Sequence, residues 1–256
     1  MFTDLPFTAV VFVAACAVTL FGAFVKGAVG FAMPMIMVSG LASFMPAHSA
    51  LAALIVPTLL ANVWQAFRGG FGPALGVVRE YRAFLAVVLV WIALAAQLVT
   101  ALPEPVMLLV LGVPVIAFAA LQLAGWTPRI GRAQRWRADL AIGTAAGICG
   151  GLSGVWGPPT VLYLAAINAP KVQAIRVQGV VYGAGAVVLL LAHLRSGIVN
   201  AQTAPLSVAL VPAMLVGMWV GQRVQDRLDQ RRFRRVMLAV LLVAGANLIR
   251  RGIAGL

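Results

Sequence analysis

The sequence predicts an all-helical multi-pass membrane protein made of two inverted repeats, each with about five transmembrane or half-membrane helices. Of its 256 residues, 62% are apolar and only 10% are charged. A soluble domain has about 25% charged residues, so this chain has too few charges to cover a surface that faces water. Its apolar runs are continuous rather than alternating, which favours spanning helices over an outer-membrane barrel.

Eight apolar runs predict the membrane segments. They lie at residues 7–45, 50–67, 83–101, 106–125, 139–167, 177–194, 205–221 and 236–253. The run 7–45 is too long for one helix, because the hydrocarbon core needs about 20 residues, so we expect it to turn at Lys26 and Gly27. The run 139–167 has a glycine-rich break at 147–159. Each of these two runs is expected to form two crossings, or a hairpin with a broken tip near the midplane.

The two halves of the chain carry matching motifs, which predict an internal repeat. The segment GAVGFAMP at residues 27–34 aligns with GLSGVWGP at residues 151–158, so that two glycines and a proline coincide. After a short slip, Ala47, Arg68 and Gly70 fall on Ala174, Arg195 and Gly197. We therefore expect a first membrane repeat at 1–125, a basic cytoplasmic linker at 126–138 and a second membrane repeat at 139–256.

The distribution of charge predicts the orientation. A net charge of +13 is typical of a membrane protein that keeps Lys and Arg in its cytoplasmic loops. The loops richest in Arg are 68–82, 126–137 and 222–235. We expect them in the cytoplasm of a bacterial cell, with the chain in the plasma membrane and the N-terminus outside. Loop 102–105 has no cation, unlike its mate 222–235, so the second repeat is expected to be inverted. Arg250 and Arg251 are the exception, because this topology places them on the outer side of the membrane, whereas Lys and Arg usually stay on the cytoplasmic side.

Several classes of function have no support in the sequence. There is no Ser/His/Asp set, HExxH motif, Walker A loop or Rossmann fingerprint, so we expect neither an enzyme nor a cofactor. Cys16 and Cys149 lie far apart in apolar runs and predict inert thiols rather than a disulfide or a metal site. The basic excess is explained by orientation, and nucleic acid is not an expected partner. The first apolar run lacks a basic n-region and is predicted to be retained.

Lys26 is the most informative single residue, because a cation within an apolar run is costly and usually faces a pathway or a partner. The carboxylates are all expected in loops or at helix ends, and they are Asp4, Glu80, Glu104, Asp139, Asp226 and Asp229. No acidic partner for Lys26 is therefore predicted within a span. Beside glycine-lined helix termini, such a lysine suits an anion. The alternative is that Lys26 is a turn residue on the cytoplasmic side.

Neutral polar residues within the spans are further candidates for the site. Asn62 and Gln65 share one helical face, as do Gln178 and Tyr182. Their donors suit an oxyanion, although hydrogen bonding between helices explains them equally. The glycines at 143, 147, 151, 179, 183, 217 and 221 have the small-xxx-small spacing of close helix packing, which explains them better than ligand binding.

Three segments carry a family resemblance. VKGAVGFAMPMIMVSG, GGLSGVWGPPTVLYLAAIN and QAIRVQGVVYGAGAVV resemble the repeated motifs of the TauE/SafE sulfite exporter family, also called the 4-toluene sulfonate uptake permease family. The likeness covers essentially the whole chain. It departs from the family pattern at Ala32 and Met33, where further glycines are frequent. The resemblance implies a plasma-membrane carrier for sulfite, sulfonates or related sulfur-containing organic anions.

Together the residues and the resemblance give an expected substrate site. Its members are Lys26, Gly27, Gly30, Asn62, Gln65, Gly151, Ser153, Gly154, Trp156, Arg176 and Gln178. Trp156 has a second interpretation as an interface-belt residue. The expected function is secondary transport of a small sulfur-containing anion by alternating access, with export as the expected direction. The alternatives are an anion channel and a non-transporting membrane scaffold. The expected partners are the anion and the lipid bilayer, with a homodimer as a possible assembly.

Overall fold

The computed structural model describes residues 8–125, 129–224 and 230–256, and the regular structure of these residues is helical. In chain order the elements are α1 (Ala9–Val29), α2 (Met33–Leu41), α3 (Ala47–Phe67), α4 (Phe71–Glu80), α5 (Arg82–Ala95), η1 (Ala96–Ala101), α6 (Glu104–Leu123), η2 (Arg132–Gln134), α7 (Arg135–Ser153), α8 (Gly157–Ala166), α9 (Lys171–Arg195), α10 (Ala204–Ala209), α11 (Val211–Val224) and α12 (Gln230–Ala254). The helical class that the sequence predicts is confirmed.

The run 7–45 folds as a long helix followed by a short one. The turn that the sequence predicts at Lys26 and Gly27 is wrong, because both residues lie within α1, which ends at Val29. Its C-cap, Gly30, has a left-handed φ of 89° and donates its N–H to the Lys26 carbonyl at 2.7 Å. Ala32 also has a positive φ, of 79°, and the short helix α2 begins directly after it, with Pro34 in its first turn. Glycine meets such a conformation without strain, whereas alanine does not.

The run 139–167 repeats this arrangement. Helix α7 ends at Ser153, and its C-cap, Gly154, has a φ of 70° and donates its N–H to the Gly150 carbonyl at 2.8 Å. Helix α8 then begins at Gly157, with Pro158 in its first turn. Each of the two long apolar runs is therefore a long helix joined to a short one through a left-handed residue.

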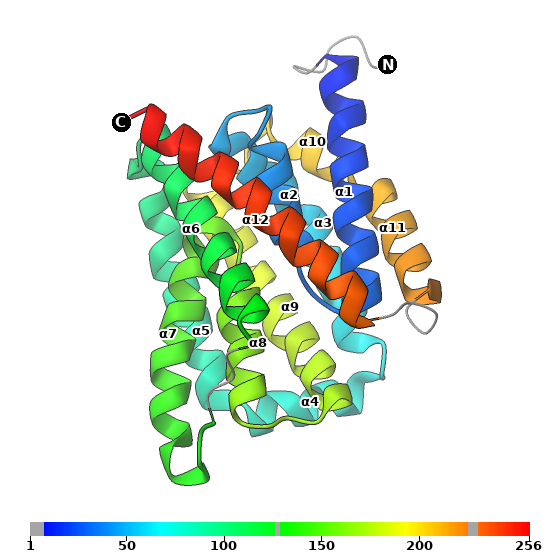
Figure 1. Ribbon diagram of the computed structural model, residues 1–256, viewed down its shortest axis with the longest axis vertical. Helices are drawn as coiled ribbons and strands as arrows, with labels where there is room; N and C mark the ends of the chain where they lie inside the picture. Colours follow the sequence, from blue (N-terminus) through cyan, green and yellow to red (C-terminus); the bar gives the residue numbers. More distant parts are fainter. Residues whose placement is uncertain (1–7, 126–128, 225–229) are drawn as a thin grey trace.

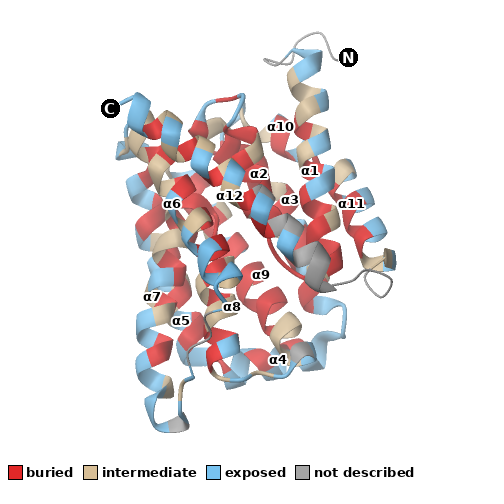
Figure 2. Ribbon diagram, in the orientation of Figure 1, coloured by how far each residue is buried: buried red, intermediate tan, exposed pale blue. Residues whose placement is uncertain are grey.

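Among the described residues, six helical stretches are long and apolar enough to cross a membrane: Ala9–Val29, Ala47–Phe67, Arg82–Ala101, Glu104–Leu123, Val172–Arg195 and Ala204–Val224. Helices α3 and α9 are the most buried of the six and pack against each other. In the colouring by burial, the exposed residues of the bundle lie mainly on its outer helices (Figure 2). Large apolar side chains such as Val10, Leu98 and Val243 are exposed there, as expected of a surface in contact with lipid.

The remaining long helices pack in pairs, with α1 on α11, α7 on α5 and α6 on α12. Glycines set how closely these pairs approach. A Cβ on Gly27 would lie 2.6 Å from the Met218 carbonyl oxygen of α11, and one on Gly151 would lie 2.7 Å from the Ile92 carbonyl oxygen of α5. Close helix packing is therefore confirmed for Gly151, and it is confirmed also for Gly147, Gly179, Gly217 and Gly221.

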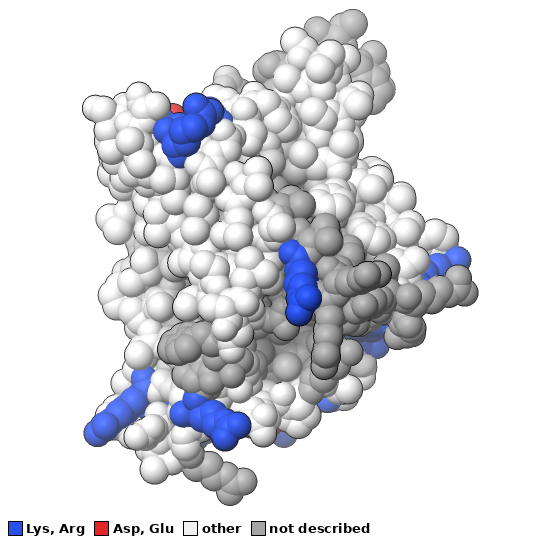
Figure 3. All heavy atoms as spheres, in the orientation of Figure 1, with Lys and Arg blue, Asp and Glu red and all other residues white. Residues whose placement is uncertain are grey.

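The bundle has two distinct ends. We call them the α4 end, which α4 crosses at the bottom of Figure 1, and the terminal end, where α1 begins and α12 ends. On the face drawn in Figure 3, Lys and Arg side chains lie from mid-height down to the α4 end, with one further basic cluster at the terminal end. Arg68 and Arg79 lie beside or within α4, whereas Arg250 and Arg251 lie in the last turns of α12.

Candidate functional site

Lys26 lies in the last turn of α1 and is buried, with 2% of its surface exposed. Its ammonium nitrogen lies 5.6 Å from the centre of the Tyr182 ring, a distance at which a cation and an aromatic face attract each other. Among the described residues, Nζ has no hydrogen-bond partner. A buried cation with only an aromatic face beside it retains its capacity to bind an anion.

A pocket of about 190 Å³ opens beside Lys26. Its lining comes from α1, from the end of α3, from the start of α9 and from α11, and consists of Lys26, Gly27, Gly30, Gln65, Arg68, Gly69, Val172, Ile175, Arg176, Met218 and Gln222. Three of these residues, Lys26, Arg68 and Arg176, are cations, and the described part of the lining contains no Asp or Glu. The pocket is therefore suited to a small anion.

Hydrogen bonds fix the tip of α1 in the wall of the pocket. The Gln65 amide nitrogen donates to the Gly30 carbonyl at 2.9 Å and to the Ile175 carbonyl at 3.2 Å. This one side chain therefore ties α1 to both α3 and α9. Gln178 lies close to Gly30 and is buried, and its amide oxygen has no partner among the described residues. Rotation of that amide would present its NH₂ group instead.

Five of the expected site residues line this pocket: Lys26, Gly27, Gly30, Gln65 and Arg176. Asn62 and Gln178 lie one helical turn or less from it. Asn62 is buried, and its amide nitrogen donates to the Tyr182 backbone carbonyl at 3.2 Å, so it joins α3 to α9. Of the two roles expected for Asn62, substrate binding and hydrogen bonding between helices, its contact with α9 is of the second kind.

The break between α7 and α8, at residues 151–157, is called the second tip, and that between α1 and α2 the first. The expected site residues of the second tip do not line the pocket. Gly151 packs on α5, and Gly154 lies against Leu54. The Ser153 hydroxyl donates to the Cys149 carbonyl at 2.5 Å and accepts from the Val155 N–H at 3.3 Å, so the local backbone already engages it. Trp156 is 1% exposed, which places it in the interior rather than in an interface belt.

Tyr182 links the two tips. Its ring faces Lys26, and its hydroxyl donates to the Gly157 carbonyl of the second tip at 3.3 Å. The Trp156 ring lies 6.3 Å from the Tyr182 ring, centre to centre. From the sequence, Tyr182 is notable only because it shares a helical face with Gln178, and it is not among the expected site residues.

The expected site also missed Arg68, Gly69 and Gln222. A signal for Arg68 was present in the sequence, because it follows Asn62 and Gln65 at the same spacing of three and so continues their helical face. Gln222 carried no such signal, since only the packing of α11 on α1 brings it to the pocket.

Of the six carboxylates, Asp4, Asp226 and Asp229 lie outside the described residues. Glu80, Glu104 and Asp139 lie at helix ends, as expected, but Asp139 is buried. Asp139, in the second turn of α7, is 9% exposed and accepts a 2.5 Å hydrogen bond from the Tyr163 hydroxyl of α8. Nearby, the Arg135 guanidinium lies 4.9 Å from the centre of the Tyr81 ring. Burial, together with the charge of Glu80, raises the pKa of the Tyr81 hydroxyl, which therefore stays neutral. These contacts hold α7 and α8 at the α4 end.

Composition, spanning helices and a buried cationic pocket define a multi-pass membrane protein. The chain belongs to the TauE/SafE sulfite exporter family, because the model of that family matches residues 15–248. This match confirms the resemblance, and it makes the protein a member of a family of membrane transporters. Neither the curated proteins nor the solved structures include a match to this chain.

Proposed function

We propose that this protein is a carrier for a small sulfur-containing anion, a sulfonate or sulfite, and that the Lys26 pocket binds the anion. The observation that carries the proposal is a buried ammonium group that has no hydrogen-bond partner among the described residues, in a pocket whose described lining holds two further cations and no carboxylate. Such a site favours anions over cations and zwitterions. The family supplies the sulfur chemistry.

The parts of the pocket have distinct roles in this proposal. Lys26 supplies its ammonium group at the base, where water is largely excluded and the attraction to an anion is correspondingly strong. Val172 and Ile175 belong to the first turns of α9, whose free N–H groups and positive end favour an anion. Arg68 and Arg176, at the ends of α3 and α9 nearest to the α4 end, would attract the anion to the mouth.

The two halves are proposed to form an inverted repeat that works by alternating access. The packing supports this: α1 packs on α11 as its counterpart α7 packs on α5, and each long tip helix is followed by a short one. The counterparts α3 and α9 pack on each other, as do α6 and α12. Carriers built from such repeats bind substrate where broken helices of the two halves meet, and Tyr182 lies between the two tips here.

The basic α4 end is proposed to face the cytoplasm of a bacterial cell and the terminal end to face outside. Arg68 and Gly69 line the pocket at the α4 end, so in this proposed orientation the pocket would open toward the cytoplasm. This state would load substrate for export. Above Lys26 the path is filled by the buried side chains of Tyr182 and Trp156, which favours a carrier over an open channel.

Counterflow in proteoliposomes tests the proposal. Vesicles preloaded with unlabelled sulfite, isethionate or sulfoacetate are diluted into the same anion carrying a radioactive label. A carrier accumulates label transiently and saturates, and its flux rises with anion on the opposite side. Label that only equilibrates, without this stimulation, would support a channel. No flux of any of these anions, together with no stabilisation of the purified protein by them, would favour the scaffold.

A further inference from the structure

An apolar groove on the outer surface of the bundle lies apart from the anion pocket. It runs between α3, α4 and α9, has a volume of about 290 Å³ and shares no described lining residue with that pocket. Its described lining is wholly apolar. Small buried residues such as Ala66 and Gly183 lie within it, and exposed residues such as Phe67, Phe71 and Val187 border it. The groove is therefore suited to an apolar occupant from the lipid phase.

The dimensions of the groove fit a hydrocarbon chain. Helix α9 crosses the membrane from the α4 end, and its residues from Val180 to Val187 line the groove over about 10 Å. The groove therefore runs from the α4 end toward the middle of the bilayer. A helix of a second copy is about 10–12 Å wide with its side chains, so it could place only single side chains in a groove of this volume. One acyl chain that lies along α9 can fill it.

Helix α4 brings the groove to the level of the lipid headgroups. This helix crosses the ends of the spanning helices (Figure 1). Its side chains Phe71 and Leu75 line the groove and are exposed, whereas Ala74 and Val77 are buried against the bundle. Arg79 follows in its last turn. A short helix with exposed apolar side chains beside an arginine is typical of the interface between acyl chains and headgroups. The groove therefore begins where a phospholipid carries its charge.

The charges next to the groove are positive. Arg79 directly follows a groove residue of α4, and Arg82 begins α5. Both are exposed, and neither forms an ion pair with a described carboxylate. Glu80 stands between them in the sequence, but it contacts other elements: it accepts from the Gln173 amide at 2.9 Å and lies 4.0 Å from the Arg135 guanidinium. Two guanidinium groups are therefore available to a negative group at this point.

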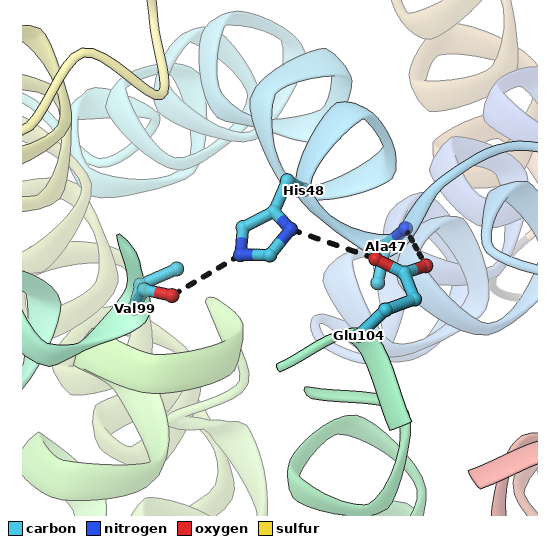
Figure 4. A network of polar contacts seen from close by, with 4 residues as sticks. All are labelled: Ala47, His48, Val99 and Glu104. Carbon is cyan, nitrogen blue, oxygen red and sulfur yellow. Dashed lines mark hydrogen bonds and ion pairs between the residues drawn. The ribbon is translucent and has the colours of Figure 1, made fainter. Parts of the chain in front are cut away.

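The terminal end presents its charged groups differently. There His48 Nδ1 and a Glu104 carboxylate oxygen lie 3.5 Å apart (Figure 4). The two arginines in the last turns of α12 contact oxygens of the protein, since Arg250 donates to a neighbouring asparagine side chain and Arg251 donates to the carbonyl at the end of α2. These arginines serve contacts within the protein, whereas Arg79 is left for a ligand.

We propose that this groove is a binding site for an anionic phospholipid, with one acyl chain along α9 and the headgroup phosphate beside Arg79 and Arg82. The apolar lining supplies affinity that every phospholipid shares. The arginines supply the selection, because a guanidinium group binds phosphate with two parallel hydrogen bonds and attracts a headgroup of net negative charge. The lipid joins α4 to α3 and α9 and so stabilises the folded protein, whichever anion the pocket carries.

The first test compares phosphatidylglycerol with phosphatidylcholine of the same acyl chains, by native mass spectrometry of the delipidated protein in detergent. The first phosphatidylglycerol should bind roughly 25-fold more tightly, because each arginine near an anionic headgroup contributes about fivefold. This preference should disappear in Arg79→Gln/Arg82→Gln. It should persist in Arg195→Gln/Arg250→Gln, the matched control, which loses the same charge at the terminal end. Equal affinity for the two lipids in the wild type, or an unchanged preference in the Arg79/Arg82 variant, would overturn the proposal.

The second test fills the groove. Ala184→Phe places a ring among the lining residues, whereas Leu191→Phe adds bulk to an exposed position of α9 two turns further on, outside the groove. Ala184→Phe should weaken the binding of both lipids about tenfold or more, because two methylene groups kept out of the groove already account for that factor. Leu191→Phe should bind as the wild type does. Unchanged lipid binding in Ala184→Phe would refute the site. A lipid-free dimer in the wild type that Ala184→Phe abolishes would assign the groove to a second copy instead.

Discussion

Replacement of Lys26 by Met tests two expected effects of its buried ammonium group: it binds the anion, and without an anion it lowers the stability of the protein. Methionine is unbranched and of similar length, so it fills the space beside Tyr182 and on α11. A hydrogen bond from a charged group contributes about 1.5–3 kcal/mol, and 1.4 kcal/mol is a factor of ten. Anion affinity should therefore fall roughly 10- to 150-fold. Without ligand, the variant should instead be more stable, because a buried polar atom with no partner costs about 1–3 kcal/mol.

The assay is thermal unfolding of the detergent-purified protein across a titration of each sulfur anion. Lys26→Met should start from a higher midpoint than the wild type, by a few degrees, and should show little or no rise with anion. Arg195→Met is the matched control, because Arg195 is exposed at the end of α9 far from Arg176. An unchanged apparent Kd in Lys26→Met would remove Lys26 from the site. A lower midpoint without ligand would show that the ammonium group has a stabilising partner.

Three further outcomes follow from the same geometry. Arg176→Gln should slow anion capture most at low salt, because salt screens the attraction between a charge at the mouth of the pocket and the approaching anion. Initial uptake rates, measured against ionic strength, test this. Tyr182→Phe should keep the aromatic face over Lys26 and lose the hydrogen bond to the Gly157 carbonyl, which should lower the free energy of unfolding by about 0.5–1.5 kcal/mol. Loss of anion binding in this variant would instead assign the hydroxyl to the site. Gly221→Ala would drive a methyl group into the Phe24 carbonyl and should cost about 1–3 kcal/mol, whereas Gly76→Ala, with open space around it, should be neutral or stabilising; equal midpoints would contradict the close packing of α1 and α11.

The helical membrane fold was readable from the sequence because its signals are local. Long apolar runs, a left-handed glycine after each long tip helix and a proline at the start of each short one lie within a few residues of each other. The first half of the site was readable for the same reason. Lys26 and Gly30 both line the pocket, and a cation in an apolar run is rare enough to single out a candidate site.

The sequence does not predict that the second tip, at residues 151–157, lies outside the pocket, because this depends on contacts between distant segments. The motif treats the two tips as equivalents, yet a lysine occupies the first tip where Gly150 stands in the second, and Trp156 fills the space beside it. Ser153 is polar but satisfied by its own helix. Arg68 was assigned to a loop by its neighbours, whereas the crossing of α3 and α9 turns it into the pocket.

The placement of the chain ends has a practical consequence for the question of assembly. Helix α1 begins and helix α12 ends at the same end of the bundle (Figure 1). Two copies can therefore be joined head to tail by a short flexible linker, and both keep the same orientation without an added spanning helix. A tandem of one intact copy and one Lys26→Met copy would then report subunit independence. Half the flux of the intact tandem indicates protomers that work alone, and complete loss indicates a coupled pair.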